Sequence, residues 1–313
     1  MQITNSILMV RPASFAYNAE TAATNFFQNN HSYTAIELLK KALEEFDAMV
    51  NVLKSNDINV IVIEDTDEPL KPDAIFPNNW FSTDHKGVID VFPMQAKSRR
   101  DEKRDDILEM ISKKFKITDV IDWSEYEADA FYLEGTGSMV MDHQNKIIYA
   151  CLSGRTSKSL VEKFAATKGY RAITFTAIDN NGNNIYHTNV MMCIGEGFSI
   201  VCPKAIADDD ERIAVAQLLE TTGHENIYIT HDQMNSFAGN MLHIKSNGGK
   251  RFIILSKNAY DSLLENQKQR LESYGKLLPI DVSVIEKVEG GSVRCMMAEI
   301  FAPPLMELNT LNG

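Results

Sequence analysis

The sequence is poor in cysteine and has no long apolar run. Its four cysteines in 313 residues are too few for a fold built on disulfides, and no two have the CxxC spacing of a thiolate metal site. No segment approaches the roughly 18 apolar residues of a membrane span. The first residues lack the basic start and the apolar stretch of a signal peptide. We therefore expect a cytoplasmic protein that binds no metal.

Basic residues are also scarce relative to acidic ones. Lysine and arginine total 31 against 43 aspartates and glutamates, which gives a net charge of −12. Such a charge argues against a nucleic-acid partner and against an anionic membrane surface. A content of 44% hydrophobic and 24% charged residues is typical of a soluble globular protein. Because the chain has no linker or low-complexity tract, we expect one domain over residues 1–313.

What the sequence does contain is a repeated pattern of an apolar run, a polar turn and a second apolar run. Four copies are complete and a fifth has only its first half; they begin at residues 78, 136, 188, 239 and 292. Equivalent positions are Asn79, Gly137, Asn189, Asn240 and Arg294, at steps of 58, 52, 51 and 54 residues. Periods of this size indicate a repeat architecture.

Helical patterns lie between these hairpins. Residues 34–54 carry an apolar stripe of Ile36, Leu39, Leu43, Phe46 and Val50, which predicts an amphipathic helix. Further helices are predicted at 100–115, 156–167, 208–221 and 258–274, and short strands follow at 58–64, 116–123, 170–175, 226–230 and 279–286. The repeating unit is therefore strand, strand, helix, strand, which predicts an α/β fold.

The apolar run that begins at Ser6 supplies the strand that the fifth half-hairpin lacks. Pairing between the two ends of the chain would join the repeats into a ring. A ring has no terminal repeats that need capping, unlike an open solenoid.

Three residues of catalytic types lie near equivalent hairpin starts. Cys295 follows two glycines and stands beside Arg294, a cation that would favour a thiolate. His187 and Glu134 precede two other hairpins. Taken singly, each has an ordinary alternative: a core cysteine, a structural histidine and a surface-turn glutamate. Because all three share one repeat phase, we expect them in one axial pocket, as nucleophile, general acid/base and orienting carboxylate.

Seven motifs carry a family resemblance: RPASFAYN, FPNNW, SRRDE, LEGTGS, LSGRTS, YHTNV and GGSVRC. Together they resemble the pentein superfamily, which includes arginine deiminases, amidinotransferases and dimethylarginine dimethylaminohydrolases. Within it, the chain is most similar to the citrulline-utilisation hydrolases. The resemblance runs essentially end to end. It implies five ββαβ repeats arranged as a pseudo-fivefold α/β propeller around a central active site.

The resemblance also implies roles for single residues. Cys295 matches the nucleophile that attacks the guanidino or ureido carbon, and His187 matches the group that protonates the leaving amine and then activates water. Glu134 matches the carboxylate that holds the substrate nitrogens and assists the histidine. Arg99 and Arg155 match arginines that grip the substrate carboxylate in the deiminases, a task that suits a bidentate fork.

Two positions depart from the deiminase pattern. Asn78 and Asn79 in FPNNW and Asn189 in YHTNV are expected to bind the substrate. Asn79 and Asn189 stand where the deiminases have aspartates that clamp a guanidinium. An asparagine amide has donors and an acceptor and so matches a neutral ureido group. The alternative is that these asparagines merely end strands. The Asn240 position has no obvious catalytic group and is expected only to line the pocket.

We therefore expect hydrolysis of citrulline, or of a similar ureido amino acid, through a covalent thioester on Cys295. Ornithine, ammonia and carbon dioxide would be the products, and no organic cofactor is needed. The alternatives are an arginine deiminase, dihydrolase or amidinotransferase, and a non-catalytic binding protein of the same fold. The expected partner is a small amino-acid substrate; the oligomeric state stays open, a homo-oligomer included. Residues 179–187 are a candidate lid because of their Asn/Gly content.

Overall fold

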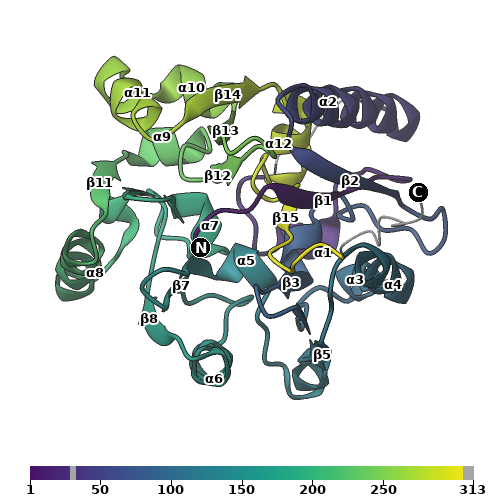
Figure 1. Cartoon of the computed structure of the whole chain (residues 1–313), viewed down its shortest axis with the longest axis horizontal. Coiled ribbons are helices and arrows are strands. Elements are labelled where there is room, and N and C mark those ends of the chain that lie inside the picture. Colours follow the sequence, from purple (N-terminus) through teal and green to yellow (C-terminus); the bar gives the residue numbers. More distant parts are fainter. Residues whose placement is uncertain (29–32, 306–313) are drawn as a thin grey trace, which may run out of the picture.

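Five sheets of three strands form the framework of the computed structural model, which describes residues 1–28 and 33–305. In each sheet the middle strand pairs antiparallel with one neighbour and parallel with the other. Figure 1 shows the five units arranged around the middle of the molecule, with α2, α4, α6, α8 and α11 at the periphery. The predicted mixed α/β class and the five repeats are confirmed.

The strands follow the predicted order of the repeats. The first sheet joins β15 (Ala298–Glu299), β1 (Ser6–Arg11) and β2 (Asn59–Glu64). The next two contain β3 (Phe81–Thr83), β4 (Val88–Val91) and β5 (Asp119–Asp122), then β6 (Val140–Asp142), β7 (Ile147–Cys151) and β8 (Arg171–Phe175). The last two contain β9 (Met192–Ile194), β10 (Phe198–Val201) and β11 (Glu225–Tyr228), then β12 (Leu242–Lys245), β13 (Arg251–Ser256) and β14 (Lys276–Ile280).

The two ends of the chain meet in the first sheet. β1 pairs antiparallel with β15, so that Ile7 lies opposite Glu299 and Leu8 opposite Ala298. The predicted pairing of the N-terminal run with the fifth half-hairpin is therefore confirmed. Since β15 begins three residues after Cys295, this pairing also anchors the segment that carries the cysteine.

Helices connect the second and third strands of most units. The longer ones are α2 (Ala35–Ser55), α4 (Asp105–Lys114), α6 (Lys158–Lys168), α8 (Asp209–Thr221), α10 (Lys257–Ser262) and α11 (Glu265–Glu272). A further helix, α12 (Ser283–Glu289), leads from β14 of the fifth sheet to β15 of the first. Short helices are α1 (Ala19–Ala22), α3 (Lys97–Arg100), α5 (Gly135–Ser138), α7 (Thr188–Met191) and α9 (His231–Asn235), with 3₁₀ turns at Pro77–Asn79, Ser124–Asp129 and Pro203–Ala205.

Helix α2 begins where its sequence signal places it. Thr34 accepts a hydrogen bond from the backbone of Glu37, whose carboxylate binds the backbone N–H of Thr34, a capping box. The predicted stripe is rotated, however. Ile36 is 84% exposed, while the buried face runs through Leu38, Ala42, Phe46, Met49, Val50 and Leu53. An isolated isoleucine in the first turn does not reach the core.

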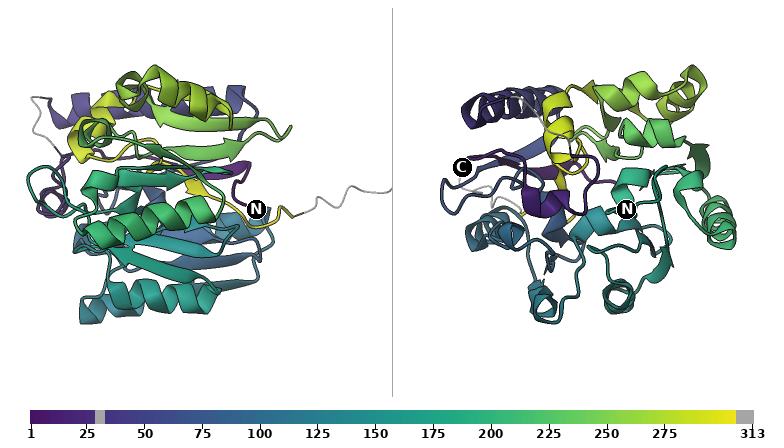
Figure 2. Two further views of the ribbon diagram at one scale, coloured as in Figure 1. Left: turned by 90° about the vertical axis from the view of Figure 1, so that its left-hand side faces the viewer. Right: turned by 180° about the vertical axis from the view of Figure 1, so that it is seen from behind.

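Two other helix predictions need correction. The helix expected at 258–274 is two helices, α10 and α11, which Leu263 and Leu264 separate in extended conformation. The strand expected at 279–286 ends at Ile280, and helix α12 follows from Ser283. Figure 2 shows the stacked units from the side and from behind, and α12 packs against α2.

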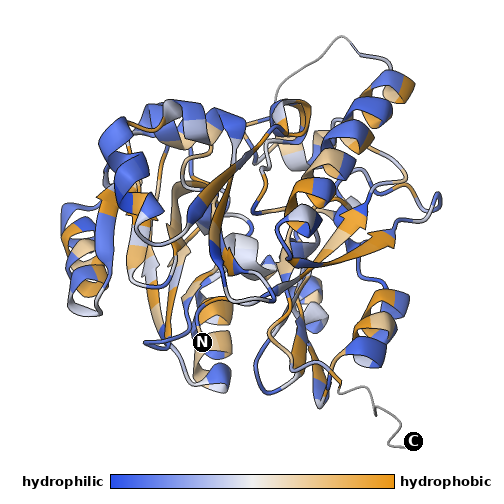
Figure 3. Ribbon diagram, turned by 45° about the horizontal axis from the view of Figure 1, so that its top comes forward, coloured by the Kyte–Doolittle hydropathy of each residue, from blue (hydrophilic) through white to orange (hydrophobic). Residues whose placement is uncertain are grey.

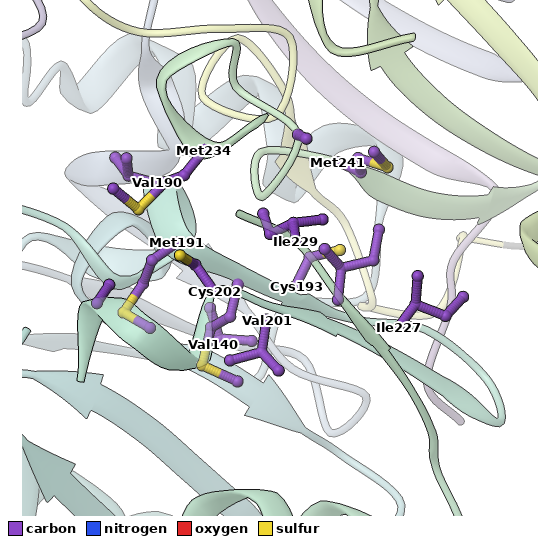
Figure 4. Close-up of a cluster of buried hydrophobic side chains, with 14 of the residues drawn as sticks. Val140, Val190, Met191, Cys193, Val201, Cys202, Ile227, Ile229, Met234 and Met241 are labelled. Atoms are coloured by element: carbon purple, nitrogen blue, oxygen red, sulfur yellow. The ribbon is translucent and has the colours of Figure 1, made fainter. Parts of the chain in front are cut away.

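The core lies between the sheets and the helices that cover them. Figure 3 shows apolar residues concentrated on the strands and on the inward helix faces, with polar residues outside. The largest buried cluster spans the third, fourth and fifth units; Figure 4 shows Val190, Met191, Cys193, Cys202 and Met241 packed together there. Such burial supplies the dominant stabilisation of a fold. Within the described residues, no helix is both long and apolar enough to cross a membrane.

Candidate active site

The candidate catalytic residues all lie in short turns that precede or form the start of an inner strand. Glu134 and His187 are the N-terminal flanking residues of α5 and α7. Asn79 ends the 3₁₀ turn before β3. Cys295 lies in the turn after α12, where its backbone N–H donates to the carbonyl of Ser292 at 2.9 Å. The repeat therefore places one functional side chain at the same point of several units.

One pocket brings most of these residues together. Asn79, Arg99, Arg155, His187 and Cys295 all contribute to its wall. These side chains are at most 3% exposed. Of the other predicted site residues, Glu134, Asn78 and Asn189 lie directly behind this wall and contact it through hydrogen bonds. The site is thus deeply buried, where electrostatic interactions are weakly screened.

His187 and Glu134 form a hydrogen-bonded pair. The histidine Nε2 lies 2.8 Å from one carboxylate oxygen, and the other oxygen accepts the backbone N–H of Gln95 at 3.0 Å. Burial opposes ionisation of Glu134, but the charge of Arg155 and the bond from His187 hold its pKa at about 2. Burial lowers the pKa of His187 to about 4, against the opposing effect of Glu134. Near neutral pH, the pair is a carboxylate and a neutral imidazole.

Two glycines of LEGTGS make this arrangement possible. Gly135 has φ of +48°, and a Cβ there would lie 2.4 Å from the carbonyl oxygen of Asn78. A Cβ on Gly137 would lie 2.7 Å from Nδ1 of His187 and 2.5 Å from Nδ2 of Asn79. Only glycine allows the histidine and the asparagine to approach α5 so closely.

Amide groups surround the sulfur of Cys295. Nδ2 of Asn189 lies 3.6 Å from Sγ, and Nδ2 of Asn240 lies 3.4 Å from it. Asn240 is fixed in turn, since it donates to the carbonyl of Asn189 and accepts the backbone N–H of Arg294. Asn240 was expected only to line the pocket, and its contact with the nucleophile sulfur was missed.

Arg294 is engaged elsewhere. Its guanidinium donates to Glu299 at 2.8 Å and to the carbonyl of Met297 at 2.9 Å. Arg294 and Glu299 line a different pocket. Their ion pair neutralises the cation that stands next to Cys295 in sequence.

Asn189 and Asn79 differ in which of their amide atoms already have hydrogen-bond partners. Oδ1 of Asn189 is buried and has no hydrogen-bond partner among the described residues. Asn79 is fully engaged: its Nδ2 donates to Oδ1 of Asn78 at 3.2 Å, and its Oδ1 accepts Nη1 of Arg99 at 2.9 Å. Asn78 also donates to Thr136 at 3.2 Å. Asn189 therefore keeps a free acceptor beside the sulfur.

The two arginines line the pocket but have strong partners within the protein. The guanidinium of Arg99 donates two hydrogen bonds of 2.8 Å to the carboxylate of Glu102. Arg155 donates to the carbonyl of Thr21 and to Thr24, and its guanidinium stacks on the ring of Tyr186 at 4.9 Å. Both guanidinium groups also approach Glu134, at 4.0 and 3.7 Å. Their charges lower the pKa of Glu134, and both arginines contribute to the pocket wall.

Two further carboxyl groups line the pocket and were missed. Asp73 and Glu289 are each 2% exposed, and each has one oxygen without a hydrogen-bond donor among the described residues. Asp73 lies six residues before Asn79, and Glu289 ends α12, three residues after the strand predicted at 279–286. Neither position carries the sequence signal that identified the others. No group of three or more metal-ligating side chains occurs in residues 1–28 and 33–305.

Comparison with known families gives one match over most of the chain. The model of the eukaryotic N,N dimethylarginine dimethylhydrolase family matches residues 11–302. No curated protein matches the chain by sequence.

Several solved structures share the fold at low sequence identity. The N-terminal domain of ArgZ, an arginine dihydrolase of cyanobacteria that was solved with substrate as a cysteine-to-serine variant, is 17% identical, with a TM-score of 0.74 over 96% of this chain and 99% of that one. The longer ArgZ chain aligns equally well, but this chain spans only 41% of it. A dimethylarginine dimethylaminohydrolase from Pseudomonas aeruginosa, solved with citrulline and also as a cysteine-to-serine variant, is 14% identical, with a TM-score of 0.63 over 96% of this chain and 100% of that one.

Proposed function

Because the chain belongs to the N,N dimethylarginine dimethylhydrolase family, a family of C–N hydrolases with a catalytic cysteine, we propose that it hydrolyses the ureido group of citrulline or of a similar ureido amino acid. The family is part of the pentein superfamily, so the resemblance found in the sequence is confirmed. The five units around one site fit the propeller arrangement of that superfamily. A cytoplasmic location and a free amino acid as partner belong to this proposal.

The amide groups around Cys295 are the observation that supports a ureido substrate. Attack on a ureido carbon converts its carbonyl oxygen into an oxyanion, which N–H donors beside the sulfur stabilise. Asn189 and Asn240 place two such donors within 3.6 Å of Sγ. The unpartnered Oδ1 of Asn189 accepts a ureido N–H. A guanidinium, which carries positive charge and only donors, would be better matched by carboxylates at these positions.

The histidine–carboxylate pair supplies the proton transfers. His187 is neutral near pH 7, because burial holds its pKa at about 4, and a neutral imidazole accepts the thiol proton of Cys295. The resulting imidazolium is stabilised by the ionised Glu134 at 2.8 Å. Proton transfer by a positioned group of this kind contributes a factor of roughly 10² to 10⁴.

The first half of the reaction forms the Sγ–C bond to the ureido carbon. The C–N bond to the side-chain nitrogen of ornithine then breaks, and His187 gives the thiol proton to that nitrogen. Ornithine leaves, and a carbamoyl thioester remains on Cys295. Dividing the hydrolysis into two displacements replaces one difficult step by two easier ones.

The second half consumes one water molecule. His187 removes a proton from the water molecule, and the water oxygen attacks the thioester carbon. The C–S bond then breaks, and His187 gives the proton to the sulfur. The released carbamic acid decomposes to ammonia and carbon dioxide. In both halves, Arg99 and Arg155 keep Glu134 ionised, and we propose that their pocket-facing N–H groups bind the substrate carboxylate.

A guanidino hydrolase is the second candidate, and a specific observation favours it. Asp73 and Glu289 place two carboxyl groups in the pocket wall, which suits a substrate with more positive charge than citrulline. The structurally similar ArgZ is an arginine dihydrolase, although identity at that level shows the fold alone.

One experiment separates the two candidates. The purified protein is incubated with citrulline and, separately, with arginine, and ornithine, citrulline and ammonia are quantified. Ornithine from citrulline is expected, and Cys295→Ala should abolish it while the circular dichroism spectrum is unchanged. Turnover of arginine with no turnover of citrulline would replace the proposal by the second candidate. Normal turnover of citrulline by the alanine variant would refute the thioester mechanism.

The asparagines give a second arm of this experiment. The double variant Asn79→Asp with Asn189→Asp should lose turnover of citrulline, because a carboxylate would repel the developing oxyanion and the thiolate. Its preference should move toward arginine by a factor of roughly 10² or more, since each hydrogen bond to a charged group is worth about 1.5–3 kcal/mol. An unchanged ratio of kcat/KM for the two substrates would show that these amides do not select the ureido group.

A further inference from the structure

Tyr186 is a buried tyrosine of the pocket wall that the proposed reaction leaves without a role. It directly precedes His187 in the YHTNV motif and lines the pocket together with His187 and Cys295. The residue is only 5% exposed. Its ring lies 4.8 Å from the ring of His187 and 4.9 Å from the guanidinium of Arg155. Tyr186 therefore packs against two of the proposed site residues.

The hydroxyl of Tyr186 reaches the end of the chain that carries Cys295. It donates to the carbonyl of Gly290 at 2.6 Å, a bond between residues 104 positions apart. This separation is at the short end of the range for an O–H···O bond. Burial raises the pKa of Tyr186 above its usual value, and the charge of Cys295 adds to this effect. The hydroxyl therefore keeps its proton near neutral pH and remains a donor.

The carbonyl that accepts this bond belongs to a fixed helix end. Gly290 follows the last residue of α12 in the left-handed conformation, with φ of +64°, and its N–H donates to the carbonyl of Glu286 at 2.9 Å. The carboxylate of Glu286 also accepts the hydroxyl of Ser292 at 2.6 Å. The carbonyl of Ser292 in turn accepts the backbone N–H of Cys295 at 2.9 Å. The turn of Cys295 is thus held to the same helix end as Gly290.

The histidine is supported from a different unit. The carbonyl of Tyr186 accepts Oγ of Ser153, in the loop after β7, at 2.8 Å. His187 itself is bound to Glu134, which flanks α5. These bonds hold the histidine segment against the third unit, whereas the cysteine turn follows α12. The hydroxyl of Tyr186 connects the two supports.

We propose that Tyr186 is a positioning residue, whose hydroxyl sets the distance between the imidazole of His187 and the sulfur of Cys295. Without the bond to Gly290, the two segments can move apart, and proton transfer between imidazole and sulfur slows. Tyr186 itself gains or loses no proton. The proposal rests on the proposed function only in taking Cys295 as the nucleophile and His187 as its base, so it applies equally to a ureido and to a guanidino substrate.

Tyr186→Phe removes one oxygen atom and keeps the ring that packs on His187 and Arg155. Because a displacement of about 1 Å in a catalytic group can cost roughly 10²-fold in rate, kcat should fall by about 10- to 100-fold. KM should stay within about twofold, since the groups proposed to bind the substrate are untouched. Alkylation of Cys295 by iodoacetamide at pH 7 should slow by a similar factor, because the thiolate is the reactive form and the displaced imidazole removes the thiol proton less effectively.

The test combines steady-state kinetics with citrulline and with arginine and the alkylation rate, which needs no substrate and is read from the Cys295 peptide by mass spectrometry. His187→Ala gives the alkylation rate without the base, and the rate of Tyr186→Phe should lie between it and the wild-type rate. Tyr149→Phe is the matched control. Tyr149 is also fully buried, but it lies outside the pocket wall, so its variant should keep wild-type values in both assays.

Ser292→Ala tests the same connection from the cysteine side. It releases the turn of Cys295 from Glu286 and leaves Tyr186 and His187 unchanged. Lower kcat with unchanged KM, and slower alkylation, are expected here as well. This variant decides the question if Tyr186→Phe does not give the circular dichroism spectrum of the folded protein.

The outcomes separate the positioning role from the proposed reaction. Wild-type kcat and alkylation rate in folded Tyr186→Phe overturn the positioning role, as does a rise in KM without a loss of kcat or an equal loss in Tyr149→Phe. Hydrolysis of arginine in place of citrulline, with the same losses in Tyr186→Phe, keeps the positioning role and overturns the ureido substrate. Equal alkylation rates in the wild type and His187→Ala refute the base role of His187, and with it the proposed reaction.

Discussion

At the scale of single residues, the proposed nucleophile and the proposed proton-transfer group have different neighbours. Cys295 contacts the amides of Asn189 and Asn240, whereas His187 is bound to Glu134. Both amides are neutral, and that of Asn240 is fixed by backbone hydrogen bonds, so they present donors to the sulfur at every pH at which the protein is folded. The proposed mechanism therefore assigns proton transfer to the histidine pair and the choice of substrate polarity to the amides.

Asn240 gives the sharpest test of the amide environment. Asn240→Asp keeps the acceptor for the backbone N–H of Arg294 at 3.0 Å but replaces the donor to Sγ by a carboxylate oxygen. The loss of a donor and the repulsion of a thiolate should lower kcat by a factor of roughly 10² to 10³, the range found when an oxyanion donor is removed. Steady-state kinetics with citrulline measures this loss.

The control for this variant is Asn247→Asp, in an exposed loop. It makes the same chemical change and should leave kcat within a factor of about two of wild type, as surface substitutions usually do. If Asn240→Asp keeps full activity while folded, the amides around the sulfur do not contribute to the reaction.

Gly137 tests the packing between the histidine and helix α5. In Gly137→Ala, the new methyl group would lie 2.7 Å from Nδ1 of His187, so the imidazole must move. Because a displacement of about 1 Å in a catalytic group can cost roughly 10²-fold in rate, kcat should fall at least that far. Gly248→Ala meets nothing closer than 3.7 Å and should keep wild-type kinetics; equal kinetics in both variants would contradict the argument.

The sequence predicts the site residues that share the repeat phase and misses those outside it. Glu134, His187 and Cys295 are found because equivalent positions of repeated units converge in space. Asp73 and Glu289 lie six and five residues before the repeat positions Asn79 and Arg294, outside the hairpin starts that were compared, and the fold brings them into one pocket wall. Arg294 shows the opposite error: it is adjacent to Cys295 in sequence, but its guanidinium turns to Glu299.

At the scale of secondary-structure elements, helix α12 links the first long helix of the chain to Cys295. The carboxylate of Glu45 on α2 accepts the backbone N–H groups of Val284 and Ile285 at 2.9 and 3.0 Å. It thereby caps α12, whose last residues lead into the turn of Cys295. Glu45 is separated from Val284 and Ile285 by 239 and 240 residues. The local sequence around α12 therefore does not contain the residue that caps it.

The cap predicts a dependence of stability on pH. Burial raises the pKa of Glu45 to about 7, despite the two backbone bonds. A carboxyl group whose pKa is raised on folding contributes stability that is fully present below about pH 4.5 and is lost as the pH rises through about 7. The wild-type protein should therefore lose stability relative to Glu45→Gln between pH 5 and pH 8. Urea unfolding at both values measures the difference.

The matched control is Glu44→Gln, one residue earlier on the exposed side of α2. Its difference in unfolding free energy from wild type should be the same at pH 5 and pH 8. A Glu45→Gln difference that does not change with pH would show that Glu45 does not titrate in this range.

The two main errors in the elements have physical causes. The segment VSVIE has the alternating β-branched residues of a strand, but capping by Glu45 and burial of Ile285 and Val288 against α2 favour a helix. The apolar period of residues 34–54 is real, yet Ile36 and Leu38 compete for the inner face. Tertiary packing selects Leu38. Repeats with two clear hairpin strands leave no such competition, and their pairing is predicted correctly.

At the scale of the whole molecule, pairing of the chain ends connects the first unit to the last. β1 lies between β15 and β2, so one strand ties the segment after Cys295 to the strand that follows α2. Thr4 adds a side-chain bond to the carbonyl of Ile300 at 2.6 Å. The position of Cys295 therefore depends on residues at the opposite end of the chain, and stability should be shared among the units.

Leu8→Ala tests this dependence. Leu8 is fully buried in a cluster with Val10, Trp80 and Ala298, and such truncations cost about 2–5 kcal/mol. In a Trp80→Phe background, Trp123 is the one remaining tryptophan, and it belongs to a different buried cluster. If the units unfold as one domain, the Trp123 emission, far-UV circular dichroism and enzymatic activity should all lose their folded signal at the same, lower urea concentration. A Trp123 transition that stays at the wild-type midpoint while activity shifts would show that the units unfold separately.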